Sequence, residues 1–197
     1  MTEILFATNN RHKIEEVRSI LRPDFRILGL SDINCTEDLP ETRDTLEGNA
    51  EQKARYVFEK FGMPCFADDS GLEVKSLNGE PGVRSARYAG LHGNSEENIR
   101  LLLRNLEGVA DRSARFRTVI ALLGDGGNIK LFEGVIGGTL LTEKRGTAGF
   151  GYDPLFVPDG HALTFAEMSP TMKNTISHRA LAMNKLVDYL KEIAKVK

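Results

Sequence analysis

Long apolar runs and paired cysteines are both missing from this chain of 197 residues. The longest apolar runs, such as Val119 to Leu123, fall far short of the ~20 residues that a helix needs to span a bilayer. The start, Met1-Thr2-Glu3, has neither the basic nor the apolar segment of a secretory leader. Cys35 and Cys65 are isolated in the sequence, which disfavours a disulfide framework and a structural zinc site. These absences predict a soluble, cytoplasmic protein with reduced thiols.

An excess of positive charge is missing as well. The chain has 26 Lys and Arg residues against 28 Asp and Glu residues, for a formal net charge of −2. Nucleic acids and anionic membranes attract basic surfaces, so we expect neither as a partner. Any anionic ligand must therefore be held by a local group of residues. Hydrophobic residues make up 41% of the chain, a value typical of globular proteins, and the length predicts one domain, residues 1–197.

The spacing of apolar residues predicts an α/β fold with a mixed central β-sheet and flanking helices. An apolar run at Ile4–Ala7 predicts a buried strand, and helical spacing follows from Ile14 to Leu21. A capping-box pattern at Asp44–Glu47 predicts the start of a second helix. Further strands are expected at 25–30, 65–67, 72–77, 116–123 and 129–136, and further helices at 95–106 and near the C-terminus. The turn 124–127 predicts a hairpin between the last two of these strands.

The segment Thr8–Lys13 lies where the first strand turns into the first helix. Backbone N–H groups and the positive end of the helix dipole converge at such a turn, which favours an anion. Arg11 and Lys13 add charge that could partner phosphate oxygens, although the segment is not a Walker A loop. The alternative is a helix capped by an asparagine, with the basic side chains merely solvated.

Two aspartates, Asp68 and Asp69, follow an apolar strand. Successive side chains of an extended chain point to opposite faces, so the two carboxylates should not act as one dyad. One could bind a divalent cation or take a proton from water while the other holds a turn; alternatively, both are structural. The preceding acidic residues are either a further source of oxygen ligands or an exposed acidic loop; they are Glu37, Asp38, Glu41 and Asp44.

Two more segments contain candidate ligand-binding groups. The glycine-rich stretch Gly146–Pro154 permits close approach of a ligand, and a planar base could stack on Phe150. The alternative is an ordinary loop with Phe150 in the core. Lys173, His178 and Arg179 place three donors within a few residues, which fits either a binding site or a set of surface and capping residues.

Five motifs in this order resemble those of the inosine triphosphate pyrophosphatase family. They are Thr8-Asn9-Asn10-x-x-Lys13, Ala67-Asp68-Asp69-Ser70-Gly71-Leu72, Gly82-Val83-x-Ser85-Ala86-Arg87, Phe150-Gly151-Tyr152-Asp153-Pro154 and Ile176-Ser177-His178-Arg179. The resemblance runs from Ile4 to the last helix and covers essentially the whole chain. Five ordered motifs are far more specific than any single one.

The resemblance implies an α/β fold with two lobes around a nucleotide cleft, a cytoplasmic homodimer, and Mg²⁺-dependent hydrolysis of non-standard purine nucleoside triphosphates (ITP, dITP, XTP) to monophosphate and pyrophosphate. Asp69 would be the catalytic proton acceptor and a metal ligand, with Glu41 as the second metal contact. The implied phosphate-binding residues are Thr8, Asn9, Asn10, Arg11, His12, Lys13 and Lys53. The implied nucleotide-binding residues are Ser70, Phe150, Gly151, Tyr152, Asp153, Lys173, His178 and Arg179.

The chain departs from the family pattern at Asn9 and Ala148, where the family commonly has glycine. Asn tolerates a positive φ better than most residues, whereas Ala148 would be strained if its position needs a left-handed backbone. Two alternative functions are a nucleotide-binding sensor without turnover and a related-fold pyrophosphatase for modified or pyrimidine nucleotides. The three ionisable residues Lys13, Glu41 and Asp69 disfavour the sensor, and the Ser177-His178-Arg179 motif disfavours the related-fold enzyme.

Overall fold

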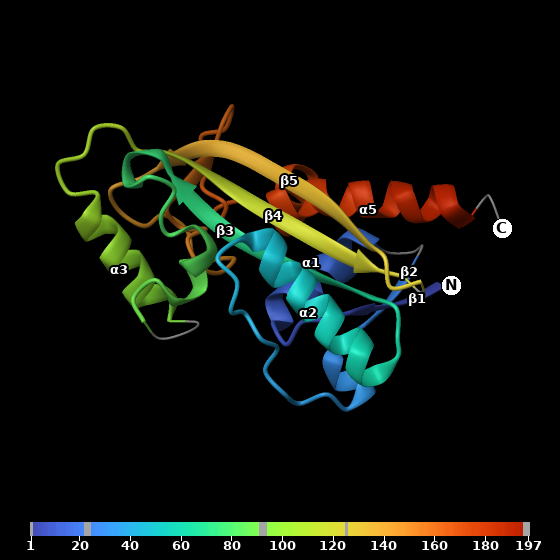
Figure 1. The fold of residues 1–197 in the computed structure, drawn as a ribbon. Helices are drawn as coiled ribbons and strands as arrows, with labels where there is room; N and C mark the ends of the chain where they lie inside the picture. Colours follow the sequence, from blue (N-terminus) through green and yellow to red (C-terminus); the bar gives the residue numbers. More distant parts are fainter. Residues whose placement is uncertain (1, 22–24, 91–93, 125, 195–197) are drawn as a thin grey trace. The chain divides into compact units, whose positions relative to one another are not determined.

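Strands and helices alternate along the described residues of the computed structural model, which are 2–21, 25–90, 94–124 and 126–194. The strands are β1 (Thr2–Phe6), β2 (Phe25–Leu28), β3 (Cys65–Val74), β4 (Ser113–Leu123), β5 (Ile129–Leu140) and β6 (Phe156–Pro158) (Figure 1). The helices are α1 (Arg11–Leu21), α2 (Leu46–Phe61), α3 (Ser95–Asn105), α4 (Pro170–Ile176) and α5 (His178–Ala194). No helix in this part of the chain is long and apolar enough to cross a membrane.

The strands form a mixed sheet in the order β2-β1-β3-β4-β5-β6. β1 pairs in parallel with β2 and with β3, where Phe6 lies opposite Phe66, and β5 pairs antiparallel with β6. β4 and β5 are neighbours joined by residues 124–128, and so short a connection requires an antiparallel hairpin. The predicted mixed sheet is therefore confirmed. The predicted hairpin turn includes Asp125, which lies outside the described residues.

The chain forms two compact units. The first comprises Met1–Asp69, Thr118–Gly134 and His178–Lys197, and the second comprises Ser70–Arg117 and Val135–Ser177. The chain therefore passes from one unit to the other within β3, β4 and β5, and once more between α4 and α5. The cleft expected between two lobes, and the expectation of one domain over residues 1–197, stay predictions.

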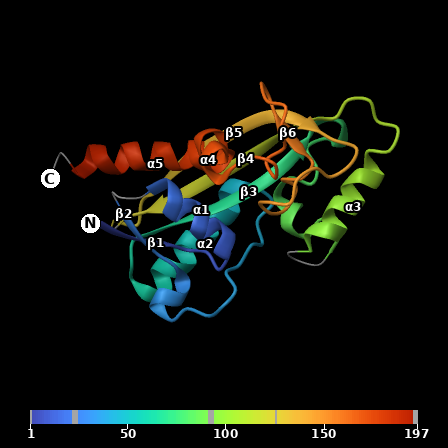
Figure 2. The ribbon, with the colours of Figure 1, turned by 180° about the vertical axis from the view of Figure 1, so that it is seen from behind.

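In the first unit, the sheet is covered on both faces (Figures 1 and 2). Successive strand residues face opposite ways, so Phe6 and Phe66 pack with α1 and α5, while Leu5, Cys65 and Ala67 pack with α2. The rings of Phe6 and Phe66 stack with centroids 4.5 Å apart. The helices contribute small and branched side chains at helical spacing; from α2 these are Ala50, Ala54 and Val57, and from α1 and α5 they include Val17, Leu21, Met183 and Leu186.

The second unit has a core of its own. Ile99 and Leu102 of α3 pack in one cluster with Leu72 of β3 and Phe116 of β4. Phe156 and Phe165 complete an aromatic group with Phe116, in which ring centroids lie 4.8–6.0 Å apart. This core supports the segment that leads from β5 through the glycine-rich loop to β6.

Three local predictions differ from the structure. β3 runs without a break through Asp68 and Asp69, where a turn was expected. Gly71 serves close packing instead, since a Cβ there would lie 2.4 Å from the carbonyl oxygen of Gly82. The helix α2 has Thr45 as its N-cap, accepting a hydrogen bond from the Gly48 N–H, rather than Asp44. The sequence analysis missed α4, whose Ser169 cap and first-turn proline are standard start signals.

Gly134 allows β5 to approach the first turn of α5. A Cβ at this position would lie 2.0 Å from the carbonyl oxygen of His178 and 2.5 Å from the backbone nitrogen of Ala182. Backbone atoms cannot move aside as a flexible side chain can. The absence of a side chain at Gly134 therefore leaves room for the first turn of α5, which carries His178 and Arg179.

Candidate functional site

The predicted phosphate turn begins directly after β1. Thr8 is buried, and its hydroxyl accepts a hydrogen bond from the Asn10 N–H at 3.2 Å. The side-chain oxygen of Asn10 accepts from the Lys13 N–H at 3.3 Å, which is the geometry of a helix N-cap. Asn9, Asn10, Arg11 and His12 are exposed at the start of α1. The asparagine cap of the structural alternative is thus present, and it leaves the helix N-terminus open toward solvent.

Lys13 is not a solvated surface lysine. Its ammonium lies 2.9 Å from one carboxylate oxygen of Asp68, and the other oxygen of Asp68 accepts from Arg179 Nε at 3.3 Å. Arg179 is 1% exposed and also pairs with Glu16 of α1. Burial alone would raise the pKa of Asp68, but the charges of Lys13 and Arg179 outweigh it and hold the pKa below its usual range. Asp68 is therefore an ionised anchor between α1 and α5.

Asp69 lies on the opposite side of β3, with α2. Its Oδ2 accepts a hydrogen bond from the side-chain amide of Asn49 at 3.1 Å, and its Oδ1 lies 3.7 Å from the ammonium of Lys53. The prediction that the neighbouring aspartates do not form a dyad is confirmed, because each has its own set of partners. Burial raises the pKa of Asp69, and the positive charges of Lys53 and Lys13 oppose this shift without cancelling it.

Glu41 meets the same lysine. Lys53 Nζ lies 2.6 Å from Glu41 Oε1, so one ammonium serves the carboxylates of both Glu41 and Asp69. Burial would lower the pKa of Lys53, but the two carboxylates outweigh it and raise the pKa. Two hard oxygen donors facing one shared cation form a suitable pair of ligands for Mg²⁺, which usually takes one or two carboxylates and completes its shell with water and phosphate. In the described part of the chain, no group of three or more His, Cys, Asp or Glu side chains could hold a metal by itself.

The segment that carries Glu41 is tied to α2 and to the phosphate turn. Asn9 donates a hydrogen bond to the carbonyl oxygen of Glu37 at 2.8 Å, and the Glu37 carboxylate pairs with Tyr56 and Lys60 of α2. Four acidic residues were predicted in this segment. Glu41 pairs with Lys53, which Asp69 also faces, and Glu37 ties the segment to α2. Glu41 is half-buried, whereas Glu37, Asp38 and Asp44 are exposed, so the alternative of an exposed acidic loop holds for three of the four residues.

The predicted site residues Ser70, Phe150 to Asp153 and Lys173 lie in the second unit, whereas His178 lies in the first. Asp153 Oδ2 accepts hydrogen bonds from the Phe150 N–H at 2.9 Å and from Lys173 Nζ at 2.8 Å. The Lys173 ammonium also lies 5.2 Å from the centroid of the half-buried Phe150 ring, a cation–π distance. This group presents an aromatic face beside a buried, charge-paired lysine. Ser70 lies half-buried in β3.

The backbone of the glycine-rich loop depends on particular glycines. Gly149 has φ +74°, and a Cβ there would lie 2.1 Å from Asp153 Oδ2. Gly151 also has a positive φ. Among the described residues, the only other residue types at positive φ are the asparagines Asn34 and Asn78. Neither Asn9 nor Ala148 adopts a left-handed backbone, so both departures from the family pattern fit the chain without strain.

Tyr152 and His178 are both buried. The Tyr152 hydroxyl donates to the carbonyl oxygen of Ser85 at 2.9 Å, and burial raises its pKa. Its side chain belongs to the core of the second unit. His178 is 5% exposed at the first position of α5, the predicted start of the last helix. Their predicted contacts with nucleotide remain predictions.

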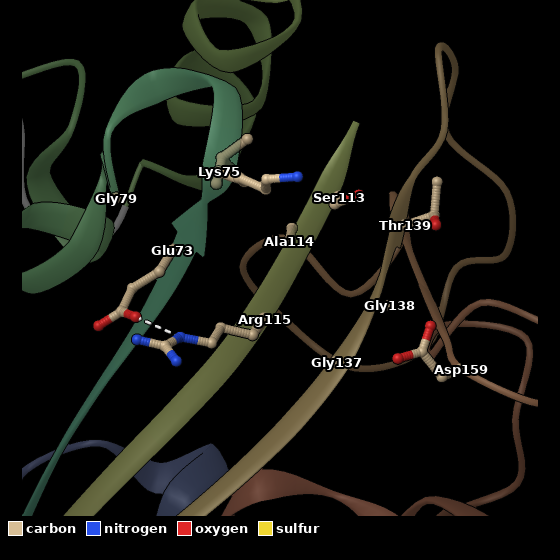
Figure 3. Close-up of a pocket in the computed structure, with 11 residues that line it drawn as sticks. Glu73, Lys75, Gly79, Ser113, Ala114, Arg115, Gly137, Gly138, Thr139 and Asp159 are labelled. Atoms are coloured by element: carbon tan, nitrogen blue, oxygen red, sulfur yellow. Dashed lines mark hydrogen bonds and ion pairs between the residues drawn. The ribbon is translucent and has the colours of Figure 1, made fainter. Parts of the chain in front are cut away.

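A pocket of about 530 Å³ lies on the second unit (Figure 3), and its lining includes none of the predicted site residues. Its wall carries charges of both signs, and Arg115 donates to Glu73 at 2.6 Å. The lining residues are Glu73, Val74, Lys75, Gly79, Ser113, Ala114, Arg115, Gly137, Gly138, Thr139 and Asp159. The lining includes two acidic and two basic side chains and no aromatic ring.

Sequence reasoning missed two residues of the buried polar network, Glu16 and Asn49, and the ion-pair partners of Asp68. The contact between Arg179 and Asp68 joins residues 111 positions apart, which no local pattern reports. Asn49 did leave a signal. It stands four residues before Lys53 and next to Ala50, so it is a polar residue on the apolar face of a helix.

The fold and this site define an α/β protein with an open helix N-terminus for an anion and two carboxylates that share a buried lysine. The chain belongs to the Ham1 family, whose sequence model matches residues 4–189. This match confirms the family resemblance found in the five motifs.

Relatives are similar along nearly the whole chain. A protein of Porphyromonas gingivalis named dITP/XTP pyrophosphatase is 56% identical over 96% of this chain and 98% of its own length. A protein of Flavobacterium johnsoniae with the same name is 52% identical over 95% of this chain and 97% of its own length. The solved structure of a HAM1 protein from Coxiella burnetii is 40% identical, covers 98% of this chain and 100% of that chain, and superimposes with a TM-score of 0.88. The predicted enzyme class agrees with the names of these relatives.

Proposed function

We propose that this protein hydrolyses dITP, ITP and XTP to the nucleoside monophosphate and pyrophosphate, and so removes non-standard purine nucleotides from the pool. The observation that carries the proposal is the group of Asp69, Glu41 and Lys53, in which two carboxylates face one buried ammonium. The near full-length similarity to proteins named dITP/XTP pyrophosphatase gives the substrate class.

Asp69 is assigned as the proton acceptor for the attacking water. Its carboxylate is buried and its pKa is raised, which makes it a better base than an exposed aspartate. A base within reach of the water supplies proton transfer in the transition state. Asp68 does not fit this role, because Lys13 and Arg179 already hold its carboxylate from two sides.

The triphosphate is assigned to the first unit. The segment from Thr8 to Lys13, in which Asn9 to His12 are exposed, offers backbone N–H groups and positive charge at the N-terminus of α1. Lys13 and Lys53 add ammonium groups, which bind phosphate oxygens as point charges.

Mg²⁺ is the proposed cofactor, held by Asp69 and Glu41. The cation that these carboxylates share in the structure is the Lys53 ammonium, which supports their ability to hold positive charge. When bound, Mg²⁺ would neutralise charge on the phosphate oxygens. Lys53 then has the task of orienting both carboxylates and any phosphate oxygen that enters beside them.

The base is assigned to Phe150 and to the donors Lys173, His178 and Arg179, with Ser70, Gly151, Tyr152 and Asp153 as further nucleotide contacts. A site that offers donors prefers O6 of inosine and xanthine to the 6-amino group of adenine, and it also penalises the 2-amino group of guanine. Each buried polar group left without a partner costs about 1–3 kcal/mol. The preference therefore amounts to roughly 10- to several hundred-fold per mismatch.

Both compact units are proposed to work as one domain, residues 1–197, in a cytoplasmic homodimer that contacts neither nucleic acid nor membrane. The net charge of −2 supports the absence of polyanionic partners. A sensor without turnover is a weaker candidate, since a sensor has no need of a buried base beside a second carboxylate. A related-fold enzyme for modified or pyrimidine nucleotides is disfavoured by the Ser177-His178-Arg179 motif.

The test is incubation with ITP, dITP, XTP, GTP and ATP in the presence of Mg²⁺, with products identified by mass. We expect monophosphate and pyrophosphate, and kcat/KM values for ITP, dITP and XTP that exceed those for GTP and ATP by about two orders of magnitude. Phosphate and diphosphate as products would overturn the proposed reaction. Equal kcat/KM for ATP and ITP would overturn the donor site for the base.

A further inference from the structure

The side-chain amide of Asn49, on α2, joins two parts of the candidate site. Asn49 is fully buried, with 0% of its surface exposed, and its side chain makes two hydrogen bonds of different kinds. The amide nitrogen donates to Asp69 Oδ2 at 3.1 Å, and the amide oxygen accepts from the Arg43 N–H at 2.9 Å. The side chain thus connects the proposed base with the segment that carries Glu41.

The orientation of this amide is fixed by its partners. A backbone N–H can only donate, and an ionised carboxylate can only accept. Turning the amide by 180° would set oxygen against the Asp69 carboxylate and NH₂ against the Arg43 N–H, so both contacts would become repulsive. The Asn49 nitrogen therefore points at Asp69 without ambiguity.

The helix places Asn49 beside Lys53. Residues four apart lie on one face of a helix, so Asn49 and Lys53 approach the Asp69 carboxylate together. Their contacts divide its two oxygens, with Asn49 at Oδ2 and Lys53 at Oδ1. An amide and an ammonium on different oxygens restrict rotation of the carboxylate about its last bond.

We propose that Asn49 is the positioning residue for Asp69. Its amide holds Oδ2 of Asp69, so that Oδ1 faces the Lys53 ammonium that Asp69 shares with Glu41. Through the Arg43 N–H, the same amide couples Asp69 to the segment that carries Glu41. This inference rests on the proposed role of Asp69 as base. Because Asn49 is fully buried and its side-chain hydrogen bonds are with Asp69 and the Arg43 N–H, it is proposed to act through Asp69 and the backbone.

The same helix supplies a matched control. Gln52 also binds the Glu41 segment through its amide, accepting from the Thr42 N–H at 3.0 Å and donating to the Thr42 hydroxyl at 2.8 Å. No contact of Gln52 reaches Asp69 in the described structure. Gln52→Ala therefore loosens the segment alone, whereas Asn49→Asp keeps an acceptor for the Arg43 N–H and removes the donor to Asp69.

The experiment compares Asn49→Asp, Gln52→Ala and Asp69→Asn by steady-state hydrolysis of ITP. We expect Asn49→Asp to lower kcat about 10- to 100-fold, as loss of a group that orients a ligand commonly does, and to change KM by less than roughly threefold. Gln52→Ala should keep kcat. If Asn49→Asp fails to fold, Asn49→Ala, which adds no charge, is expected to show the same split.

A swapped pair gives a readout without turnover. In buffer with a chelator, Asn49→Asp should lower the Tm, and the double variant Asn49→Asp/Asp69→Asn should recover it, because the new amide again donates to a carboxylate. Its kcat should stay at the level of Asp69→Asn, since the carboxylate has left the site. Tm losses of the single variants that simply add in the double variant would show that the two side chains do not interact.

Several results would overturn the proposal. Unchanged kcat in Asn49→Asp, equal losses in Asn49→Asp and Gln52→Ala, or no recovery of Tm in the swapped pair would each remove the positioning role while leaving Asp69 as base. Full activity of Asp69→Asn would instead overturn the proposed role of Asp69, and the positioning role with it.

Discussion

Asp68 and Asp69 are adjacent in β3, yet their side chains contact different helices. Asp68 pairs with residues of α1 and α5, whereas Asp69 contacts residues of α2. On the α1 and α5 side, two cations hold both oxygens of Asp68, and the pKa is lowered. On the α2 side, one amide and one more distant ammonium contact Asp69, and burial keeps its pKa raised. The comparison shows how the period of a strand can give neighbouring carboxylates different tasks. The first stabilises the unit, and the second is suited to chemistry.

The largest effect should come from Asp69→Asn. We expect kcat for ITP to fall by something like 10²–10⁴, the usual scale for loss of a general base. The free energy of unfolding should change far less, because the amide still accepts from Asn49. Steady-state rates test the expected fall in kcat, and urea denaturation of the same preparation tests the expected stability. Near-full activity would remove Asp69 from the mechanism and erase the contrast with Asp68.

Asp68→Ala should lower the free energy of unfolding far more than Asp69→Asn does. It removes the buried counter-charge of Lys13 and Arg179, and breaking a buried ion pair costs about 3–5 kcal/mol of unfolding free energy. Urea denaturation measures this loss. The matched control is Glu51→Ala, which breaks the exposed pair with Arg55 and should cost only about 0.3–0.5 kcal/mol. Equal losses in the two variants would contradict the anchoring role.

Lys13 has two roles to separate, because it pairs with Asp68 and is also assigned to the outer phosphates of the substrate. Lys13→Ala should weaken binding of ITP about 10- to 100-fold, the scale of a hydrogen bond to a charged group. Binding of the product IMP, which lacks those phosphates, should weaken less. Inhibition constants for IMP beside KM values for ITP make the comparison. Equal losses would mean that Lys13 acts through structure or general potential.

The smallest effect concerns Cys65, which lies on the α2 side of β3 like Asp69. Its thiol donates to the carbonyl oxygen of Ala54 at 3.3 Å, and burial raises its pKa to about 12. In a Cys35→Ser background, the native protein should resist iodoacetamide at pH 8, because the thiolate is the reactive form. Urea should make Cys65 reactive. Rapid labelling of the native form would show that the α2 side opens readily.

The alternation at Asp68 and Asp69, the mixed sheet and the family motifs were all predictable from the sequence. These features depend on local period or on short ordered patterns. The partners of Asp68 were not predictable, because Arg179 reaches it from 111 positions away. The uninterrupted β3 was missed for a related reason. Aspartates and a glycine favour a turn locally, whereas in the structure β3 is held between β1 and β4 in the sheet and Gly71 leaves room for the carbonyl oxygen of Gly82.

The division of the chain between two units predicts how truncated forms of the protein behave. Each unit is assembled from separate stretches, three in the first and two in the second, so no single truncation yields either one whole. A product that ends before α5 lacks Arg179 and leaves Asp68 without one of its two cations. Such fragments should collapse or be degraded rather than persist as half-proteins, and expression as two co-folding pieces would have to break the chain outside β3, β4 and β5.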